Sequence, residues 1–195
     1  MDERLLLWIN QDWGTPWLDP FFLWISERGS FTVPLLLLIL LYLARQFGRD
    51  GVKFWIMLLL VVISGDLIGN LVKHLTAQAR PCFDAFELIR QPGRAGSEPC
   101  GGNLLAMPSN HALNFFAAAL FIWSILPKRL ISFGLIVVAI LVAISRIYLA
   151  KHYPSQVAAG FLIGSFYGWI TGLLGLKYLR FLQHIKILKN AHERN

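Results

Sequence analysis

Five long apolar runs limit this chain to one class of fold. They cover residues 31–45, 54–73, 110–126, 131–150 and 157–176. Runs of about 17–20 residues, of which the first is the shortest, can cross a hydrocarbon core as helices. Since 56% of the whole chain is hydrophobic, we predict an all-α integral membrane protein. It is a bundle of about five transmembrane helices in a single domain, residues 1–195, and glycines in the last two spans fit close helix packing.

The first 30 residues have a different character. Four tryptophans lie close together in this segment, namely Trp8, Trp13, Trp17 and Trp24. Amphipathic rings of this kind favour the boundary between membrane and water. Asp19 and Glu27 disfavour a sixth span through residues 16–27. We therefore predict one or two short interfacial helices within residues 1–30, and no cleaved signal peptide, because the chain does not start with a basic leader.

The distribution of cations predicts the orientation of the bundle. Ten of the 18 lysines and arginines lie in three places: Arg45, Arg49 and Lys53; Lys128 and Arg129; and Lys177, Arg180, Lys186, Lys189 and Arg194. With five spans these places share one face, which the positive-inside rule makes cytoplasmic. The cytoplasmic loops and tail therefore account for the net charge of +7. Since no nucleic acid is needed to explain this charge, we predict no nucleic-acid partner.

The segment 177–195 is a basic cytoplasmic tail. Up to Lys189 its cations alternate with apolar residues at near-helical spacing. This pattern predicts an amphipathic helix on the inner leaflet, attracted to anionic lipid. The alternative is a plain solvated tail.

The only two cysteines bracket the one long loop. Cys82 and Cys100 flank a polar stretch rich in glycine and proline, which the topology places outside. Because disulfides persist outside the cytoplasm, we predict a bond between the two. Free thiols are the alternative, and two cysteines alone make a poor zinc site.

Polar residues gather at three junctions between spans. Lys73 to Pro81 closes the second span, Pro108 to His111 opens the third, and Ser145 to Gln156 joins the fourth to the fifth. The parity of the spans puts all three junctions at the external boundary, where they can converge. Charged groups beside hydrocarbon are costly and therefore usually functional.

The converging side chains suit a phosphoryl group. Three cations, Lys73, Arg80 and Arg146, accompany Ser109 and the free N–H groups of a helix start. Such donors form an anion site. Of the two imidazoles beside it, His111 and His152, one can attack and the other can donate a proton. Taken singly, a cation at a membrane end is usually an anchor and a lone histidine a polar contact, so the prediction rests on the combination.

The second span also carries polar groups within its apolar run. Asp66, Asn70 and Lys73 are spaced so that they share one helical face. Arg80 joins this face if the helix persists toward Pro81. For Asp66 we expect an interhelical hydrogen bond rather than direct catalysis.

The three junctions together resemble the signature of the type 2 phosphatidic acid phosphatase superfamily. The matching segments are Lys73-x6-Arg80-Pro81, Pro108-Ser109-Asn110-His111 and Ser145-Arg146-x5-His152. Their order, spacing and placement at span ends agree over roughly residues 60–175. The short chain with a Trp-rich start is similar to small bacterial members, including undecaprenyl pyrophosphate phosphatases. The resemblance implies a bacterial cytoplasmic membrane, whereas the outward-facing site rests on loop charge alone.

The resemblance also implies a mechanism. His152 would attack phosphorus to form a phosphohistidine, and His111 would protonate the departing lipid oxygen. Lys73, Arg80 and Arg146 would hold the phosphoryl oxygens, with Ser109 and the backbone at Asn110 completing the phosphate site. The family needs no metal and no other cofactor, and the implied partners are a lipid phosphate and the surrounding membrane lipids. The sequence indicates no oligomeric state.

Two positions depart from the family pattern. Asn110 stands where the second motif usually has glycine. Because the expected hydrogen-bond donor at this position is the backbone N–H, the larger side chain should be tolerated. Gln156 stands where the third motif usually has aspartate, four residues after His152. The Gln156 amide oxygen can still orient the imidazole, but a neutral side chain cannot stabilise the imidazolium.

The sequence leaves three functions open. The first is a phosphatase, with undecaprenyl pyrophosphate as the leading substrate and phosphatidylglycerol phosphate, lipid A 1-phosphate and phosphatidic acid as alternatives. The second is a lipid phosphotransferase. The third is a catalytically weakened lipid-binding homologue, which Gln156 suggests. A transporter is disfavoured because the short-looped spans show no inverted halves.

Overall fold

The computed structural model describes residues 1–93, 104–126 and 129–192, and within these ranges it contains helices and no strand. The helices are α1 (Asp2–Leu7), η1 (Trp8–Asp12), α2 (Leu18–Ile25), η2 (Arg28–Thr32), α3 (Val33–Phe47), α4 (Arg49–Thr76), α5 (Pro81–Asp84), η3 (Phe86–Leu88), α6 (Asn110–Ile125), α7 (Arg129–Tyr148) and α8 (Pro154–His192). The predicted all-α bundle is confirmed.

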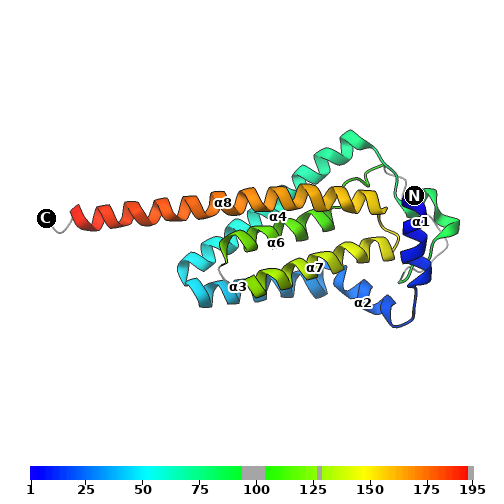
Figure 1. The fold of residues 1–195 in the computed structure, drawn as a ribbon, viewed down its shortest axis with the longest axis horizontal. Coiled ribbons are helices and arrows are strands. Elements are labelled where there is room, and N and C mark those ends of the chain that lie inside the picture. The colour runs from blue at the N-terminus through cyan, green and yellow to red at the C-terminus, as the bar shows by residue number, and fades with distance from the viewer. Residues whose placement is uncertain (94–103, 127–128, 193–195) are drawn as a thin grey trace.

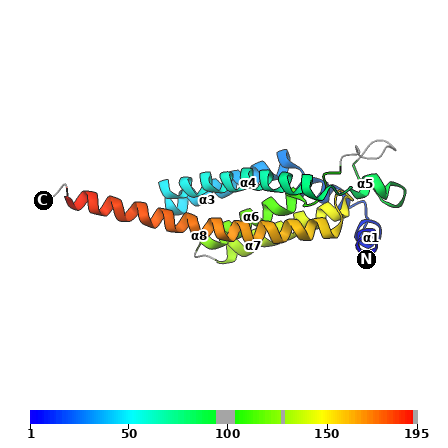
Figure 2. The same cartoon turned by 90° about the horizontal axis from the view of Figure 1, so that it is seen from above.

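The five long helices run along the long axis of the molecule (Figure 1). Seen from above, α3 and α4 form one layer over α7 and α8, and α6 lies between them (Figure 2). The central helix α6 packs against α4, α7 and α8, while α3 packs against α4. The short helix α1 lies across the end of the bundle where α8 begins, so the N-terminus is at the same end as the three polar junctions.

Four of the five predicted spans are long and apolar enough to cross a membrane. These helical stretches are Arg28–Phe47, Arg49–Thr76, Arg129–Tyr148 and Pro154–Tyr178. The fifth, α6, has 16 residues, which is about 24 Å of helix and shorter than the usual span. Because α4, α7 and α8 surround α6, much of this helix contacts protein rather than lipid.

The C-terminal segment forms no separate helix. We expected an amphipathic helix distinct from the last span, but α8 continues without a break from Pro154 to His192. Its last turns project beyond the bundle toward the C-terminus (Figure 1). No glycine or proline follows Gly175 in this helix, so nothing in the sequence ends it at the end of the span.

Glycines bring α8 into backbone contact with α6. A Cβ atom at Gly160, Gly164 or Gly168 would lie 2.6, 2.2 or 2.1 Å from a backbone carbonyl oxygen of Ser109, Leu113 or Ala117. The predicted close packing is therefore confirmed for the last span. It is wrong for Gly134 in α7, where a Cβ would meet nothing within 4 Å.

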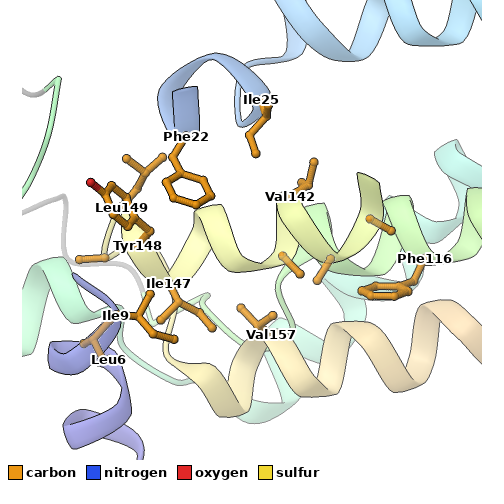
Figure 3. Packing of buried hydrophobic residues seen from close by; sticks show 14 of the residues in the cluster. Leu6, Ile9, Phe22, Ile25, Phe116, Val142, Ile147, Tyr148, Leu149 and Val157 are labelled. Atoms are coloured by element: carbon orange, nitrogen blue, oxygen red, sulfur yellow. The ribbon is translucent and has the colours of Figure 1, made fainter. Parts of the chain in front are cut away.

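The N-terminal helices are packed onto the end of α7. Phe22 and Ile25 of α2 face the end of α7 that carries Tyr148, and Leu6 and Ile9 lie near Ile147 (Figure 3). These buried side chains explain why residues 1–30 form short helices rather than a span. The predicted helices are confirmed, and their place at the membrane interface stays a prediction.

Hydrogen bonds hold the same region from the polar side. Asn10 Nδ2 donates to the carbonyl oxygens of Arg90, at 2.9 Å, and Tyr148, at 2.7 Å. Arg90 Nη2 donates to both carboxylate oxygens of Asp19, at 3.1 and 2.8 Å, and the Tyr148 hydroxyl donates to Asp19 at 2.5 Å. Asp19, which disfavoured a span, thus joins α2, α7 and the loop after η3.

The α6–α8 contact predicts a sharp difference between two glycines. Gly168→Ala places a methyl group against the Ala117 carbonyl and should lower the free energy of unfolding by about 1–3 kcal/mol, as overpacking does. Gly134→Ala, at an exposed helical position, should leave stability unchanged or raise it by up to about 1 kcal/mol. Thermal unfolding in detergent measures both, and equal effects would contradict the close contact.

Candidate active site

Arg80 lines the same cavity as Lys73 although α4 ends between them. We considered a helix that persists toward Pro81, but α4 ends at Thr76. Ala77 is in the left-handed region, with φ 45°, and its N–H donates to the Lys73 carbonyl at 3.0 Å. This is the αL termination of a helix, so the irregular chain after α4, rather than helical periodicity, places Arg80.

The end of α7 uses a related device to place His152. The Ala150 N–H donates to the Ile147 carbonyl and the Lys151 N–H donates to the Arg146 carbonyl, at 2.8 and 3.0 Å, while Ala150 has φ 49°. Both bonds and the left-handed residue define a Schellman motif. The His152 N–H also donates to the Arg146 carbonyl, at 3.1 Å, which fixes the two functional residues relative to each other.

The start of α6 is bound to the start of α8. Ser109 is the N-cap of α6 and is fully buried. Its N–H donates to the Gln156 carbonyl at 2.9 Å. The next N–H groups, at the first turn of α6, have no partner within a helix and carry the positive end of its dipole. They lie beside the loop that carries His152.

These three ends enclose one polar cavity of about 440 Å³. It is lined by Arg28, Asp66, Asn70, Lys73, Arg80, Asn110, His111, Arg146 and His152. Six of the predicted site residues are therefore brought together. Ser109 and Gln156 are not in the lining and lie behind it, both fully buried.

Several donors at this cavity lack a partner. Arg80 Nε, Ser109 Oγ and Arg146 Nε are buried atoms with no hydrogen-bond partner among the described residues. Leaving one buried donor unsatisfied costs about 1–3 kcal/mol. Two of these donors belong to arginines that line the cavity, whereas Ser109 lies behind it, and the two unsatisfied Nε donors support the binding of an anion with several oxygens.

His152 is held in one orientation by Gln156. The imidazole is 3% exposed, and its Nδ1 lies 3.3 Å from Gln156 Oε1. The same oxygen accepts the Tyr153 N–H at 3.1 Å, and Gln156 Nε2 donates to the Ala79 carbonyl at 2.8 Å. These contacts assign the amide orientation, so the Nδ1–H of His152 donates to Oε1 and Nε2 keeps its lone pair.

The environment also keeps His152 neutral. Burial, followed by the charges of Arg146 and Arg80, holds the pKa of this imidazole well below its ordinary value of 6.5. A neutral imidazole with a free Nε2 is the form that can act as a nucleophile. The neighbouring Lys151 is affected in the same way, since burial and the charge of Arg146 lower its pKa to about 8.

Asp66 joins α4 to α6. Its Oδ1 accepts hydrogen bonds from Asn110 Nδ2 at 3.0 Å and Asn114 Nδ2 at 2.8 Å. The predicted interhelical role is confirmed. Asp66 also lines the polar cavity together with Asn70 and Lys73, so the shared face predicted for these three residues is confirmed as well.

The N-terminal segment supplies groups that the sequence analysis missed. Ser26 accepts a hydrogen bond from Arg146 Nη1, and its backbone is hydrogen-bonded to His111. Arg28 lines the polar cavity. Neither residue belongs to the three motifs. One signal was present, because Arg28 is the only lysine or arginine between Arg4 and Arg45.

The predicted disulfide stays a prediction. Cys82 is buried at the start of α5, whereas Cys100 lies outside the described residues. As for metals, no group of three or more His, Cys, Asp or Glu side chains that could hold an ion occurs in the described ranges.

The polar cavity continues into apolar space. A second cavity of about 220 Å³ shares Arg28, Asp66 and His111 with it and adds Thr32, Val33, Val62, Asn114 and Phe115. Four of these residues, Thr32, Val62, Asn114 and Phe115, also line a third cavity, whose other walls are apolar side chains of α3, α6 and α7. A polar site thus opens into a hydrophobic groove between helices.

Comparison with known families identifies this arrangement. The sequence profile of the PAP2 superfamily matches residues 54–178, which include all three junctions. The chain belongs to the PAP2 superfamily. The resemblance inferred from the three motifs is therefore confirmed.

Curated PAP2 relatives cover most of the chain and differ in their substrates. The lipid A 4′-phosphatase of Bacteroides thetaiotaomicron is 27% identical over 94% of this chain and 80% of its own. The undecaprenyl-diphosphatase of Sulfolobus acidocaldarius is 28% identical over 80% of this chain and 68% of its own. The two names describe different lipids, so identity alone selects neither.

A solved structure shares the fold. The PAP2-type phosphatidylglycerolphosphate phosphatase from Bacillus subtilis superposes with a TM-score of 0.66 over 90% of this chain and 86% of its own, at 24% identity. The bundle is therefore that of a transmembrane PAP2 protein.

The departure of Asn110 from the usual PAP2 motif has a structural explanation. Its side chain points to α4, where Nδ2 donates to Asp66 and to Asn70 Oδ1, the latter at 3.1 Å. A Cβ atom at Gly69 would lie 2.4 Å from Asn110 Oδ1. Gly69 thus makes room for the larger side chain, and the backbone of α6 keeps its place.

The contact between Asp66 and the two asparagines predicts a large effect on stability. Asp66→Ala removes an acceptor shared by two hydrogen bonds and should lower the free energy of unfolding by about 2–4 kcal/mol, since bonds to charged groups contribute most. Asp50→Ala in the same helix removes an exposed ion pair with Lys53 and should cost less than about 1 kcal/mol. Thermal unfolding in detergent compares them, and equal losses would contradict this role of Asp66.

Proposed function

We propose that this PAP2 protein is a membrane lipid phosphatase, with undecaprenyl pyrophosphate as its first substrate candidate. One observation supports this most: a cavity lined by four cations and two histidines shares three lining residues with a second cavity, which in turn shares four with the apolar groove. The polar end suits a phosphoryl group and the groove suits a hydrocarbon tail. Phosphatidylglycerol phosphate, lipid A 1-phosphate and phosphatidic acid are the other candidates.

The proposed reaction uses the two histidines that line the polar cavity. His152 Nε2 attacks phosphorus while the bond from phosphorus to the lipid oxygen breaks, and His111 gives its proton to that oxygen. Lys73, Arg80 and Arg146 hold the remaining phosphoryl oxygens as their charge develops. Water then attacks phosphorus as the bond to His152 Nε2 breaks and passes a proton back to His111, which releases phosphate and restores both histidines.

The proposed setting is a bacterial cytoplasmic membrane, with the cavity facing outward and the C-terminus inside. The support comes from loop charge and from the common location of the N-terminus and the three junctions at one end of the bundle. A phosphotransferase, which passes the phosphoryl group to another acceptor, uses the same site. Gln156 keeps a third reading open, that of a catalytically weakened lipid-binding homologue.

The proposal predicts metal-independent phosphate release that depends on His152. His152→Ala should reduce release by at least about 10³-fold, because covalent catalysis is lost. His74→Ala is the matched control, since His74 is exposed in α4 and lines none of these cavities. The measurement is phosphate release in detergent, with chelator, from undecaprenyl pyrophosphate, phosphatidylglycerol phosphate and phosphatidic acid.

The other readings give different results in this assay. Transfer of labelled phosphate to an acceptor lipid instead of water would establish the phosphotransferase. Binding of all three lipids without release would establish the lipid-binding homologue. Equal activity of the His152→Ala and parent proteins would overturn the proposed mechanism.

Gln156→Asp should raise both kcat and KM, so that turnover becomes faster while substrate binding becomes weaker. A carboxylate beside Nδ1 stabilises the imidazolium and raises kcat. The same change removes the Nε2 donor that binds the Ala79 carbonyl next to Arg80, and KM should rise by about two- to tenfold, the equivalent of one ordinary hydrogen bond. Gln46→Asp, an exposed change in α3, is the control. A fall in kcat would contradict the role assigned to the missing charge.

A further inference from the structure

Arg28 is the one cation of the polar cavity that no family motif contains. It begins η2, ahead of α3, whereas Lys73, Arg80 and Arg146 come from the three junctions. Its side chain is exposed, and it forms no salt bridge within the described residues. The neighbouring Glu27 carboxylate accepts the Ser30 hydroxyl at 2.5 Å. Arg28 is therefore available to an anion in the cavity.

The position of Arg28 differs from that of the other three cations. Only Arg28, Asp66 and His111 line both the polar cavity and the second cavity that leads to the apolar groove. Lys73, Arg80, Arg146 and His152 line the polar cavity but not the second one. Arg28 thus marks the passage between the phosphoryl site and the groove.

The proposed reaction predicts which part of the substrate occupies this passage. The phosphorus atom lies beside His152, and the oxygen that leaves lies beside His111. Whatever is attached to that oxygen must then extend through the passage lined by His111 and Arg28 toward the groove. In a lipid monophosphate this group is an alcohol, which is neutral. In a lipid diphosphate it is a second phosphate, which is anionic.

We infer that Arg28 binds the phosphate that leaves with the lipid, and that it thereby selects lipid diphosphates over lipid monophosphates. This inference rests on the proposed function. A guanidinium binds a phosphate through charge-assisted hydrogen bonds, and it stabilises the charge that develops on a departing phosphate more than it affects an alcohol.

The charges around the passage are compatible with a second phosphate. Asp66 is the only carboxylate in the lining of the polar cavity, and its Oδ1 already accepts hydrogen bonds from Asn110 and Asn114. Among the described residues that line the passage, Arg28 is the one cation and Asp66, which is bound to α6, is the one carboxylate, while the other three cations line the adjoining polar cavity. A diphosphate carries more negative charge than a single phosphate. In the proposed reaction three cations bind the phosphoryl group that is transferred, and Arg28 remains to bind the second phosphate.

The test compares two substrates that share a tail. Farnesyl diphosphate and farnesyl monophosphate are given to the full chain in detergent, and kcat/KM for phosphate release is measured for the parent protein, Arg28→Gln and Arg28→Lys. Arg28→Gln should lose at least about tenfold on the diphosphate, the loss expected for one charge-assisted hydrogen bond, and less than twofold on the monophosphate. Arg28→Lys should recover part of the loss.

Two controls separate this inference from the proposed function. Arg45→Gln removes an exposed arginine at the other end of α3 and should change neither substrate, and His152→Ala should lose both. Equal losses on the two substrates in Arg28→Gln, or no loss on either, would overturn the role of Arg28 alone. Phosphate release from neither substrate by the parent protein would overturn the proposed function and the role of Arg28 with it.

Discussion

Backbone contact between α6 and α8 determines how the polar ends of this bundle meet. Gly160, Gly164 and Gly168 carry no side chain that would hold the two helices apart. The contact ends at the site, where the Ser109 N–H donates to the Gln156 carbonyl. The first turn of α6 and the loop that carries His152 are thereby placed side by side at the polar cavity.

The site then has to keep charged groups stable beside hydrocarbon. Such groups are costly unless they are paired or hydrogen-bonded. Arg146 is held by Ser26, His152 by Gln156, and the Asn110 side chain by Asp66. Some donors at the cavity remain without a partner among the described residues, which leaves them for a ligand. The N-terminal helices therefore contribute to the site as well as cover one end of the bundle.

Much of the fold and of the site follows from local patterns. Run length predicts the helices, and the three motifs predict six of the nine residues that line the cavity. The helix face shared by Asp66, Asn70 and Lys73 follows from periodicity. Three features do not follow. Arg80 depends on a left-handed residue at Ala77, α8 continues where we expected a separate helix, and Gly134 faces open space although it resembles the packing glycines.

By itself the sequence determined the membrane class, the helical spans and the chemistry gathered at their ends, because apolar length and motif spacing are local properties. The tertiary structure alone decided which groups share a cavity, and so added Ser26 and Arg28 from the N-terminal segment. It also showed that Gln156 binds both His152 and the Ala79 carbonyl. The contacts of Ser26 with Arg146 and of Gln156 with Ala79 join residues more than 70 positions apart, and local sequence patterns do not show which distant residues meet.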